Sequence, residues 1–406
     1  MLLRQHLVQV YQAALDAVNG RLCVSRALQQ TPLQGDVYVI AIGKAAAAMM
    51  RGADEALATR LQQGLLITKT GHTAQFPEHI KQLEAGHPWP TQASLDAGDA
   101  LLAFIRSTPK DAQLLFLISG GASSLVEVLP DGISLDELHR VNDWLLGSGL
   151  DIHAMNHVRK AISAIKGGRL APQLAGRQTQ LLLISDVPGD DPATIGSGLL
   201  VPEGLLETDA PLTLPEWIAE LLQKASPAAP LADACFENIS TQIIATLSDA
   251  KKAAAKKGRA LGFEVCEHAA VLGGDAELLG QQLASELLHG PAAMHVWGGE
   301  TTVRLPPQPG RGGRNQHLAL AAAMELAGEE NVALLAAGSD GSDGPTSDAG
   351  AVVDGGSLNR GRAEGLEPDS ALLNADAGTF LAASGDLIQT GPTGTNVMDL
   401  MIALKC

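Results

Sequence analysis

The sequence predicts an α/β protein of two domains, in which helices cover layered β-sheets. Three observations lead to this fold class. The chain has 406 residues, enough for two or three domains at roughly 150 residues each. Hydrophobic residues make up 46% of it, which can fill buried cores. Short apolar runs that end in glycine-rich turns alternate with helical patterns, as in folds that bind ligands at the carboxyl ends of their strands.

Each short apolar run predicts a strand. Runs of this kind suit strands that are buried in a parallel sheet. In chain order they cover residues 37–42, 65–68, 114–118, 181–184, 243–247, 294–297 and 332–336.

Helical patterns lie before and between these runs. Residues 1–19 carry leucine and valine at helical spacing. Ser134 and Glu137 predict a capping box at the start of a helix over 134–146. Further helices are expected from Lys44 onward, within 142–166, near Lys251, over 276–288 and after His317.

The domain boundary is predicted near residues 211–230. Four prolines interrupt this stretch, which has no strong strand character. The expected division is an N-terminal domain over 1–230 and a C-terminal domain over 231–406.

Charge and composition exclude several classes of partner. Lys and Arg number 28 against 45 Asp and Glu, a net charge of −17 that repels nucleic acid and anionic membranes. No apolar run reaches the roughly 18 residues of a membrane span. The four cysteines are far apart and form no CxxC pair, and the chain starts without a secretory pattern. We therefore expect reduced thiols in a cytoplasmic protein, and the oligomeric state stays open.

Two strand-turn units of the first half predict anion binding. Gly43 and Lys44 follow the strand at 37–42, so the lysine joins the helix N-terminal amides that attract anions. Ser119, Gly120, Gly121, Ala122 and Ser123 follow the strand at 114–118. Their glycines let backbone N–H groups approach a phosphate and their hydroxyls can donate to it.

Further charged residues are candidates for binding a substrate and a metal ion. Asp186, Asp190 and Asp191 follow the strand at 181–184, where carboxylate oxygens suit Mg²⁺, although Asp191 before a proline also suits a turn. Arg159 lies in a basic helical segment and can fork onto a substrate carboxylate. Arg314 lies on a glycine-rich loop at a helix start.

The motifs in this order resemble the class II glycerate kinases, the glycerate 2-kinase family with a C-terminal MOFRL domain. The matching strings cover essentially the whole chain: GKAAAAM, TKTGH with EAGHPWP, SGGASSL, VRKAISAIKGGRLA, SDVPGDDP, GGETTV, GRGGRNQ, AAGSDGSDGPT and TGPTGTNVMDL. The resemblance implies a larger Rossmann-like N-terminal domain and a MOFRL-type α/β domain, with the active site in the cleft between them. It also implies D-glycerate and ATP as substrates, Mg²⁺ as the metal ion and 2-phosphoglycerate as the product.

The family's essential residues can be carried over to this chain. Its lysine falls on Lys44 and its arginine on Arg314, and its acidic residues fall on Asp186, Asp190, Glu300 and Asp340. We expect Asp186 to act in catalysis beside the two cations, and Asp190, Glu300 and Asp340 to bind Mg²⁺. Which carboxylate is the base stays open. The chain departs from the family pattern at Leu199 and Leu200, and at His317, where the family usually has Glu.

The inventory of residues favours phosphoryl transfer. A kinase needs cations, carboxylates for Mg²⁺ and glycine-rich backbone donors, and the chain supplies all three. The main alternative is an NAD(P)H-dependent hydroxypyruvate reductase, a name that some family members carry, but the chain has no G-x-G-x-x-G fingerprint. It also lacks the G-x-S-x-G motif of a hydrolase. A non-catalytic protein that binds a nucleotide or sugar acid is the remaining alternative.

Overall fold

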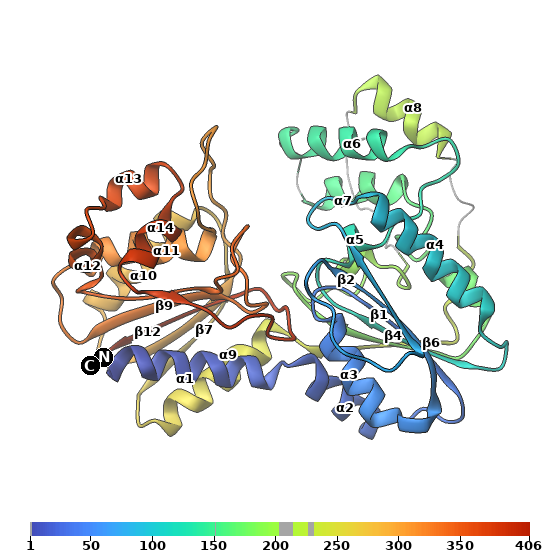
Figure 1. Cartoon of the computed structure of the whole chain (residues 1–406), viewed down its shortest axis with the longest axis horizontal. Coiled ribbons are helices and arrows are strands. Elements are labelled where there is room, and N and C mark those ends of the chain that lie inside the picture. Colours follow the sequence, from blue (N-terminus) through green and yellow to red (C-terminus); the bar gives the residue numbers. More distant parts are fainter. Residues whose placement is uncertain (1, 151, 203–213, 226–230) are drawn as a thin grey trace. The chain divides into compact units, whose positions relative to one another are not determined.

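The computed structural model describes residues 2–150, 152–202, 214–225 and 231–406, and it divides the chain into two compact units (Figure 1). The first, here called the terminal unit, combines Met1–Asn19 with Ala245–Cys406. The second, here called the central unit, is Gly20–Ile244. The chain thus has the two α/β units that the sequence predicts, but they divide it at other residues than 230 and 231.

The first helix explains the difference. In α1 (Leu2–Ala17), Leu7, Val10, Tyr11 and Ala14 are buried. This face packs on the terminal unit's sheet and on α9 (Leu247–Ala260), so α1 belongs to the later half of the chain. The predicted boundary at 211–230 lies partly outside the described residues. Its described part carries α8 (Glu216–Lys224), which packs Ile218 and Leu221 into a cluster of the central unit.

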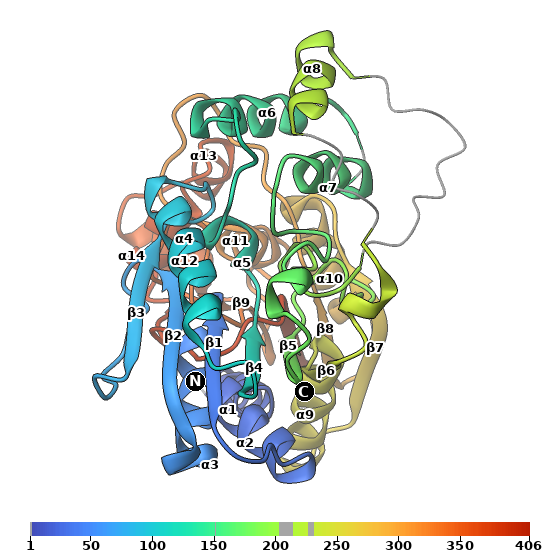
Figure 2. The ribbon, with the colours of Figure 1, turned by 90° about the vertical axis from the view of Figure 1, so that its right-hand side faces the viewer.

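The central unit is a six-stranded sheet in the order β3-β2-β1-β4-β5-β6 (Figure 2). The strands are β1 (Val37–Ile42), β2 (Leu61–Lys69), β3 (Ile80–Ala85), β4 (Gln113–Ile118), β5 (Thr179–Ile184) and β6 (Ile239–Ala245). From β3 to β5 all neighbours are parallel, as predicted. The chain order reverses between β1 and β4, and in such sheets ligands bind beyond the carboxyl ends of the strands at this reversal.

Helices cover both faces of this sheet. α3 packs on β1 and β2, and α4 packs on β2 and β3. The helices are α2 (Gly20–Gln30), α3 (Ala46–Leu57), α4 (Gln92–Ser107), α5 (Ala122–Leu125), α6 (Leu135–Gly147), α7 (Ile152–Ala161) and α8, with short 3-10 turns η1 (Ala58–Arg60), η2 (Ala171–Leu174), η3 (Ile195–Ser197) and η4 (Asp233–Cys235). The predicted capping box of Ser134 and Glu137 is confirmed at the start of α6.

The terminal unit has a mixed six-stranded sheet, in the order β11-β10-β9-β12-β8-β7. Its strands are β7 (Val265–Leu272), β8 (Met294–Gly299), β9 (Val332–Gly338), β10 (Gly350–Asp354), β11 (Leu387–Ile388) and β12 (Asp399–Lys405). The sequence predicted β8 and β9 as strands of a parallel sheet. The parallel arrangement is found between β7 and β8, but it is wrong for the rest of the sheet, because β12 lies between β8 and β9 and pairs antiparallel with both.

The predicted strand at 243–247 is also corrected. β6 ends at Ala245 because the side chain of Thr246 accepts a hydrogen bond from the N–H of Asp249 and caps α9. Residue 247 therefore belongs to a helix.

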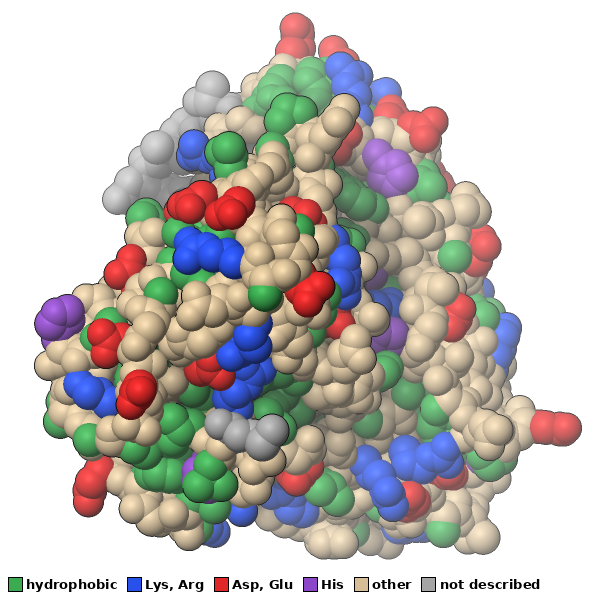
Figure 3. Space-filling model, turned by 60° about the vertical axis from the view of Figure 1, so that its left-hand side comes forward, with side chains coloured by type: hydrophobic (Ala, Val, Ile, Leu, Met, Phe, Trp, Pro, Cys, Tyr) green, Lys and Arg blue, Asp and Glu red, His purple; other side chains and the backbone are tan. Residues whose placement is uncertain are grey.

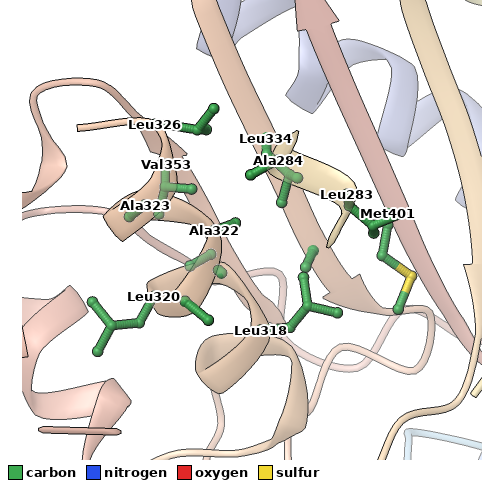
Figure 4. Packing of buried hydrophobic residues seen from close by; sticks show 14 of the residues in the cluster. Leu283, Ala284, Leu318, Leu320, Ala322, Ala323, Leu326, Leu334, Val353 and Met401 are labelled. Atoms are coloured by element: carbon green, nitrogen blue, oxygen red, sulfur yellow. The ribbon is translucent and has the colours of Figure 1, made fainter. Parts of the chain in front are cut away.

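The core of the terminal unit lies between its sheet and α11 (Arg314–Glu325). Every residue from Asn315 to Ala323 is buried, and Figure 4 shows Leu318, Ala322 and Leu326 near side chains of α10 and the sheet. α1 and α9 lie on the other face (Figure 1). The remaining helices are α10 (Ala276–His289), α12 (Ser357–Ala363), α13 (Pro368–Leu373) and α14 (Ala377–Ala383).

Two further observations concern possible membrane spans and the distribution of surface charge. In the described part of the chain, no helix combines the length and apolar character that a bilayer span requires. On the face drawn in Figure 3, basic side chains lie in small groups near acidic ones.

Candidate active site

The two predicted anion-binding loops of the central unit meet at the reversal of strand order. Gly43 follows β1 and Ser119 follows β4, the two strands on either side of it. The N–H of Lys44 donates to the carbonyl of Gly120 at 2.9 Å, and the N–H of Ala45 donates to Ser119 Oγ at 3.0 Å. The sequence predicted each loop separately as an anion-binding turn, and the fold brings the two together at one edge of the sheet. Ser119 itself is fully buried and holds the loops together.

The closeness of these loops requires glycine at two positions. A Cβ at Gly43, whose φ is 129°, would lie 2.2 Å from Ser119 Oγ. At Gly121, with φ of 84°, it would lie 3.2 Å from Lys44 Cγ and 3.3 Å from His87 Cε1. Gly121 thus makes room for the side chains of Lys44 and His87. The amides of Ala122 and Ser123 begin α5, and the first N–H groups of a helix have no partner within it.

A pocket of about 430 Å³ lies next to these loops. It contains two of the predicted residues, Ser123 and Arg159, while Lys44 and the other loop residues do not line it. Its lining consists of Pro88, Trp89, Pro90, Ser123, Ser124, Leu138, Asn142, Asn156, Arg159, Lys166 and Ser197.

Arg159 is the cation in this pocket that is open to an anion. Its Nε donates to Asn142 Oδ1 at 2.9 Å and its Nη1 to Asn156 Oδ1 at 3.4 Å. Both partners are neutral, and no carboxylate in the described part of the chain pairs with it. Burial lowers the pKa of Arg159 because the charged form loses water. A substrate carboxylate would supply the charge that the pocket lacks.

The other cation of the pocket, Lys166, is already neutralised. Its Nζ lies 2.5 Å from Glu127 Oε2, and both side chains are buried. Ser163 Oγ donates to the second oxygen of Glu127 at 2.6 Å. This pair could not be predicted from the sequence, because Glu127 and Lys166 lie 39 residues apart and nothing local to either residue indicates the other.

The loop with Ser197 lies beside Ser123. The two hydroxyls are 2.7 Å apart, and Gly196, Ser197 and Gly198 all have φ near 60°. Such a left-handed conformation is uncommon for serine and often marks functional positions. Leu199 and Leu200, which depart from the family pattern, are buried in the core of the central unit and do not line the pocket.

The acidic turn after β5 is outside the pocket. Asp186 is half-buried, and Asp190 has a left-handed φ of 54°. Asp191 accepts hydrogen bonds from Ala193 N at 3.0 Å and from Thr194 Oγ1 at 2.8 Å, which is the turn role that its position before a proline suggested.

Arg314 of the terminal unit starts α11 and is held by two carboxylates. Its Nε and Nη2 donate to the two oxygens of Asp399 at 2.5 and 2.9 Å, and its Nη1 lies 2.7 Å from Glu300 Oε1. Burial acts to lower the pKa of Arg314, but Asp399 and Glu300 outweigh it and raise the pKa above its ordinary value. The charge of Arg314 is therefore compensated, which sequence reasoning did not predict.

Strand β12 explains how Asp399 reaches this place. Its first residue, Asp399, pairs in register with Gly299 at the end of β8 and with Gly338 at the end of β9. An antiparallel strand thus brings its amino end to the carboxyl ends of its two neighbours. The only sequence signal was an acid at the start of the apolar run MDLMIAL.

Two more aspartates lie at this end of the sheet. Asp340 is 8% exposed and accepts hydrogen bonds from Ser342 N and Oγ at 2.9 and 3.0 Å. Asp343, which the sequence analysis did not single out, accepts the N–H groups of Asn315 at 3.0 Å and Gln316 at 2.8 Å. Burial raises the pKa of Asp343 to about 7.

The aspartates at this end of the sheet also affect Tyr11 on α1. The Tyr11 hydroxyl donates to the Gly338 carbonyl at 2.6 Å, and burial beside Asp340 and Asp399 raises its pKa. The carboxyl ends of β8 and β9 therefore carry a negative cluster around one arginine. Among the residues that the structure describes, no three His, Cys, Asp or Glu side chains form a ready metal site.

Comparisons with known proteins agree with these features. Residues 6–222 match the family model described as Domain of unknown function (DUF4147), and residues 293–399 match the MOFRL family. A D-glycerate 2-kinase of Thermotoga maritima is 34% identical over 99% of this chain and 98% of its own length. A protein of Agrobacterium vitis that carries the name hydroxypyruvate reductase is 35% identical over 99% of this chain and 94% of its own length.

Solved structures show the same relationship. The crystal structure of a glycerate kinase from Thermotoga maritima superposes with a TM-score of 0.84 at 32% identity, over 100% of this chain and 99% of that one. A Pyrococcus horikoshii protein superposes with a TM-score of 0.74 at 31% identity, over 99% and 98%. These matches span both units, and they show that the chain belongs to the family of glycerate kinases that join a DUF4147 domain to a MOFRL domain.

Proposed function

We propose that this protein is a phosphotransferase that moves the γ-phosphoryl group of ATP to the C2 hydroxyl of D-glycerate. Full-length relatives with the name glycerate 2-kinase support the reaction. The observation that carries the proposal is the pocket of about 430 Å³ that contains Arg159. The guanidinium of Arg159 pairs with no carboxylate among the described residues. A three-carbon hydroxy acid brings the negative charge and the hydroxyls that such a pocket binds.

Each unit has a part in this reaction. In the central unit, whose strand order supports the Rossmann-like description, Arg159 binds the glycerate carboxylate and Ser123 binds a hydroxyl. The amides of Gly120, Gly121 and Ala122 hold phosphate oxygens, with Lys44 neutralising their charge. Gly43 and Ser119 shape these loops instead, because their own N–H groups donate to Ile67 and Ile42.

The terminal unit supplies the second cation. Arg314 stabilises the charge that develops on the phosphoryl group, so it and Lys44 serve one transition state at the expected interdomain active site. Asp399 orients Arg314 by its two hydrogen bonds. Asp186 is the candidate to accept the proton of the substrate hydroxyl.

The carboxylates fit a magnesium ion that arrives with the nucleotide. Mg²⁺ is usually held by one or two carboxylates together with phosphate oxygens, so it needs no cluster of three protein ligands. Asp190, Asp340 and Glu300 are the candidates, and Glu300 would first have to exchange its contact with Arg314. When bound, the ion offsets the negative charge of the phosphates beside the acidic end of the sheet.

A coupled assay tests the reaction. Purified protein with ATP, D-glycerate and Mg²⁺ should form ADP, and phosphorus NMR should identify 2-phosphoglycerate. Excess EDTA should abolish the transfer. Formation of 3-phosphoglycerate would overturn the C2 assignment, and no ADP formation with any glycerate isomer would overturn the kinase.

Hydroxypyruvate reductase is the second candidate, because relatives at 35 and 36% identity carry that name. Its nicotinamide site would need a glycine-rich first turn, whereas the turn after β1 has the single glycine Gly43. We expect little NADH oxidation with hydroxypyruvate in the same assay. Binding of ATP and glycerate without any turnover would instead favour a non-catalytic binding protein. The expected setting for this small-molecule chemistry is the cytoplasm.

A further inference from the structure

The terminal unit contains a pocket of about 350 Å³, here called the Thr301 pocket. This volume falls in the range of about 300–1,000 Å³ typical of small-molecule sites. The residues that line it are Thr301, Thr302, Val303, Leu305, Pro309, Gly310, Gly312, Gly313, Arg314, His317, Gly344, Pro345, Ala375 and Ala377. Of its many lining residues, only Arg314 has a role in the proposed reaction so far.

Thr301 gives this pocket an unused polar group. The side chain is 2% exposed, and in the described part of the chain its Oγ1 has no hydrogen-bond partner. The neighbouring backbone is fixed, since Thr302 N donates to Gly274 O at 2.8 Å and Ala276 N donates to Thr302 O at 2.9 Å. A buried hydroxyl without a partner is costly, so a ligand that completes its hydrogen bond would gain affinity from it.

The walls of the Thr301 pocket suit the uncharged part of a ligand. Val303, Pro309 and Pro345 contribute apolar surface, and Leu305 is 64% exposed although it is a large hydrophobic residue. Burial lowers the pKa of His317 below its ordinary 6.5 although the Glu277 carboxylate, 3.7 Å from its Nε2, acts to raise it, so the imidazole is mainly uncharged at pH 7. Arg314 is then the one lining residue with a formal charge at neutral pH.

The charges around the pocket exclude a phosphate from its interior. The N-terminus of α11 would ordinarily attract an anion, but the Asp343 carboxyl group already accepts its N–H groups. Asp399 and Glu300 compensate the charge of Arg314. Of the two substrates of the proposed reaction, glycerate is small and anionic. Only the nucleoside part of ATP has apolar faces of a size that can cover these walls.

We propose that the Thr301 pocket holds the adenine and ribose of the nucleotide, with the Thr301 hydroxyl bonded to the nucleoside and Arg314 at the side where the phosphates leave. This inference rests on the proposed function and assigns a place to its nucleotide. The apolar walls and Leu305 cover the base, and the imidazole of His317, whose Nε2 lies 3.7 Å from Glu277 Oε2, borders the same pocket.

Calorimetric titration of the full chain with ADP tests the assignment. Thr301→Val replaces the hydroxyl with a methyl group of similar size, so we expect the dissociation constant of ADP to rise about tenfold while thermal stability stays equal or increases. Thr301→Ser keeps a hydroxyl and should bind ADP within about threefold of wild type. Leu305→Ser should weaken ADP binding, whereas Leu2→Ser, which changes a leucine of matched exposure (65%) on α1, should not.

The outcomes separate this assignment from the reaction itself. If Thr301→Val and Leu305→Ser are folded and bind ADP as tightly as wild type, the nucleoside binds elsewhere and the pocket assignment is overturned, even if the kinase assay succeeds. If ADP binding depends on Thr301 but no phosphorylated glycerate forms, the pocket assignment stands and the proposed function fails. Should Thr301→Val not fold, the ADP titrations of Leu305→Ser and Leu2→Ser decide alone.

Discussion

The ion pair between Arg314 and Asp399 yields the sharpest quantitative prediction. Asp399 is 1% exposed and makes two hydrogen bonds to a guanidinium that is itself 34% exposed. Removing one partner of a fully buried pair costs about 3–5 kcal/mol. Because Arg314 keeps some water and its contact with Glu300, we expect Asp399→Asn to cost roughly 2–3 kcal/mol.

Thermal unfolding can measure this loss. For a unit of this size, each kcal/mol shifts Tm by about 2–4 °C, so Asp399→Asn should lower the Tm of the terminal unit by about 4–12 °C. The matched control is Glu300→Gln, which removes a half-exposed partner of the same arginine. An exposed ion pair is worth about 0.2–1 kcal/mol, so the control should shift Tm by less than about 4 °C.

The same variants test the catalytic role of the pair. At a temperature well below both Tm values, Asp399→Asn should lower kcat at least about tenfold, because Arg314 loses its orientation. If Asp399→Asn had the same Tm as Glu300→Gln and kept the wild-type kcat, the bidentate pair would have neither the structural nor the positioning role assigned to it.

Three other predictions concern the two units separately and together. Lys44→Ala and Arg314→Ala should each lower kcat at least about 100-fold, and the double variant should lose less than the product of the single losses. Folded single variants that keep more than about a tenth of the wild-type kcat would contradict the shared role. Arg159→Met should raise KM for glycerate by about 10- to 150-fold and leave KM for ATP unchanged, because it removes a charge-assisted hydrogen bond to the glycerate carboxylate. An unchanged KM for glycerate would mean that the carboxylate binds elsewhere. The pKa of Asp343 is about 7 in the folded protein against 3.8 as its ordinary value, so the folded state binds the extra proton and stability falls as pH rises from about 4 to 7. Denaturant unfolding should show this fall exceeding that of Asp343→Asn by at least about 1.4 kcal/mol, and parallel profiles would refute the raised pKa.

The loops of the central unit could be predicted from the sequence because their signals are local. An apolar run followed by Gly43 and Lys44, and another followed by Ser119 to Gly121, each contain a strand, a turn and a helix start. Parallel strands then bring the two turns to one edge. Arg159 was also found locally, as a cation in an acidic chain, but its neutral partners Asn142 and Asn156 appear only in the fold.

The acidic partners of Arg314 could not be predicted because they depend on pairing between distant segments. Asp399 lies 85 residues after Arg314, and only the insertion of β12 between β8 and β9 brings it there. Sequence periodicity cannot distinguish that placement from an edge strand. The unused hydroxyl of Thr301 was missed for a related reason, since the lack of a partner is a property of the surroundings.

The attachment of α1 to the later half of the chain sets an order for biosynthesis. Gly20–Ile244 leaves the ribosome as one continuous segment and can fold while translation continues. The apolar face of α1, with Leu7, Val10 and Leu15, stays uncovered until β9, β10 and β12 have been synthesised, because these strands follow the central unit in the chain. A nascent chain stalled before β12 would therefore leave part of the apolar face of α1 exposed, and exposed apolar surface of this kind is what chaperones bind.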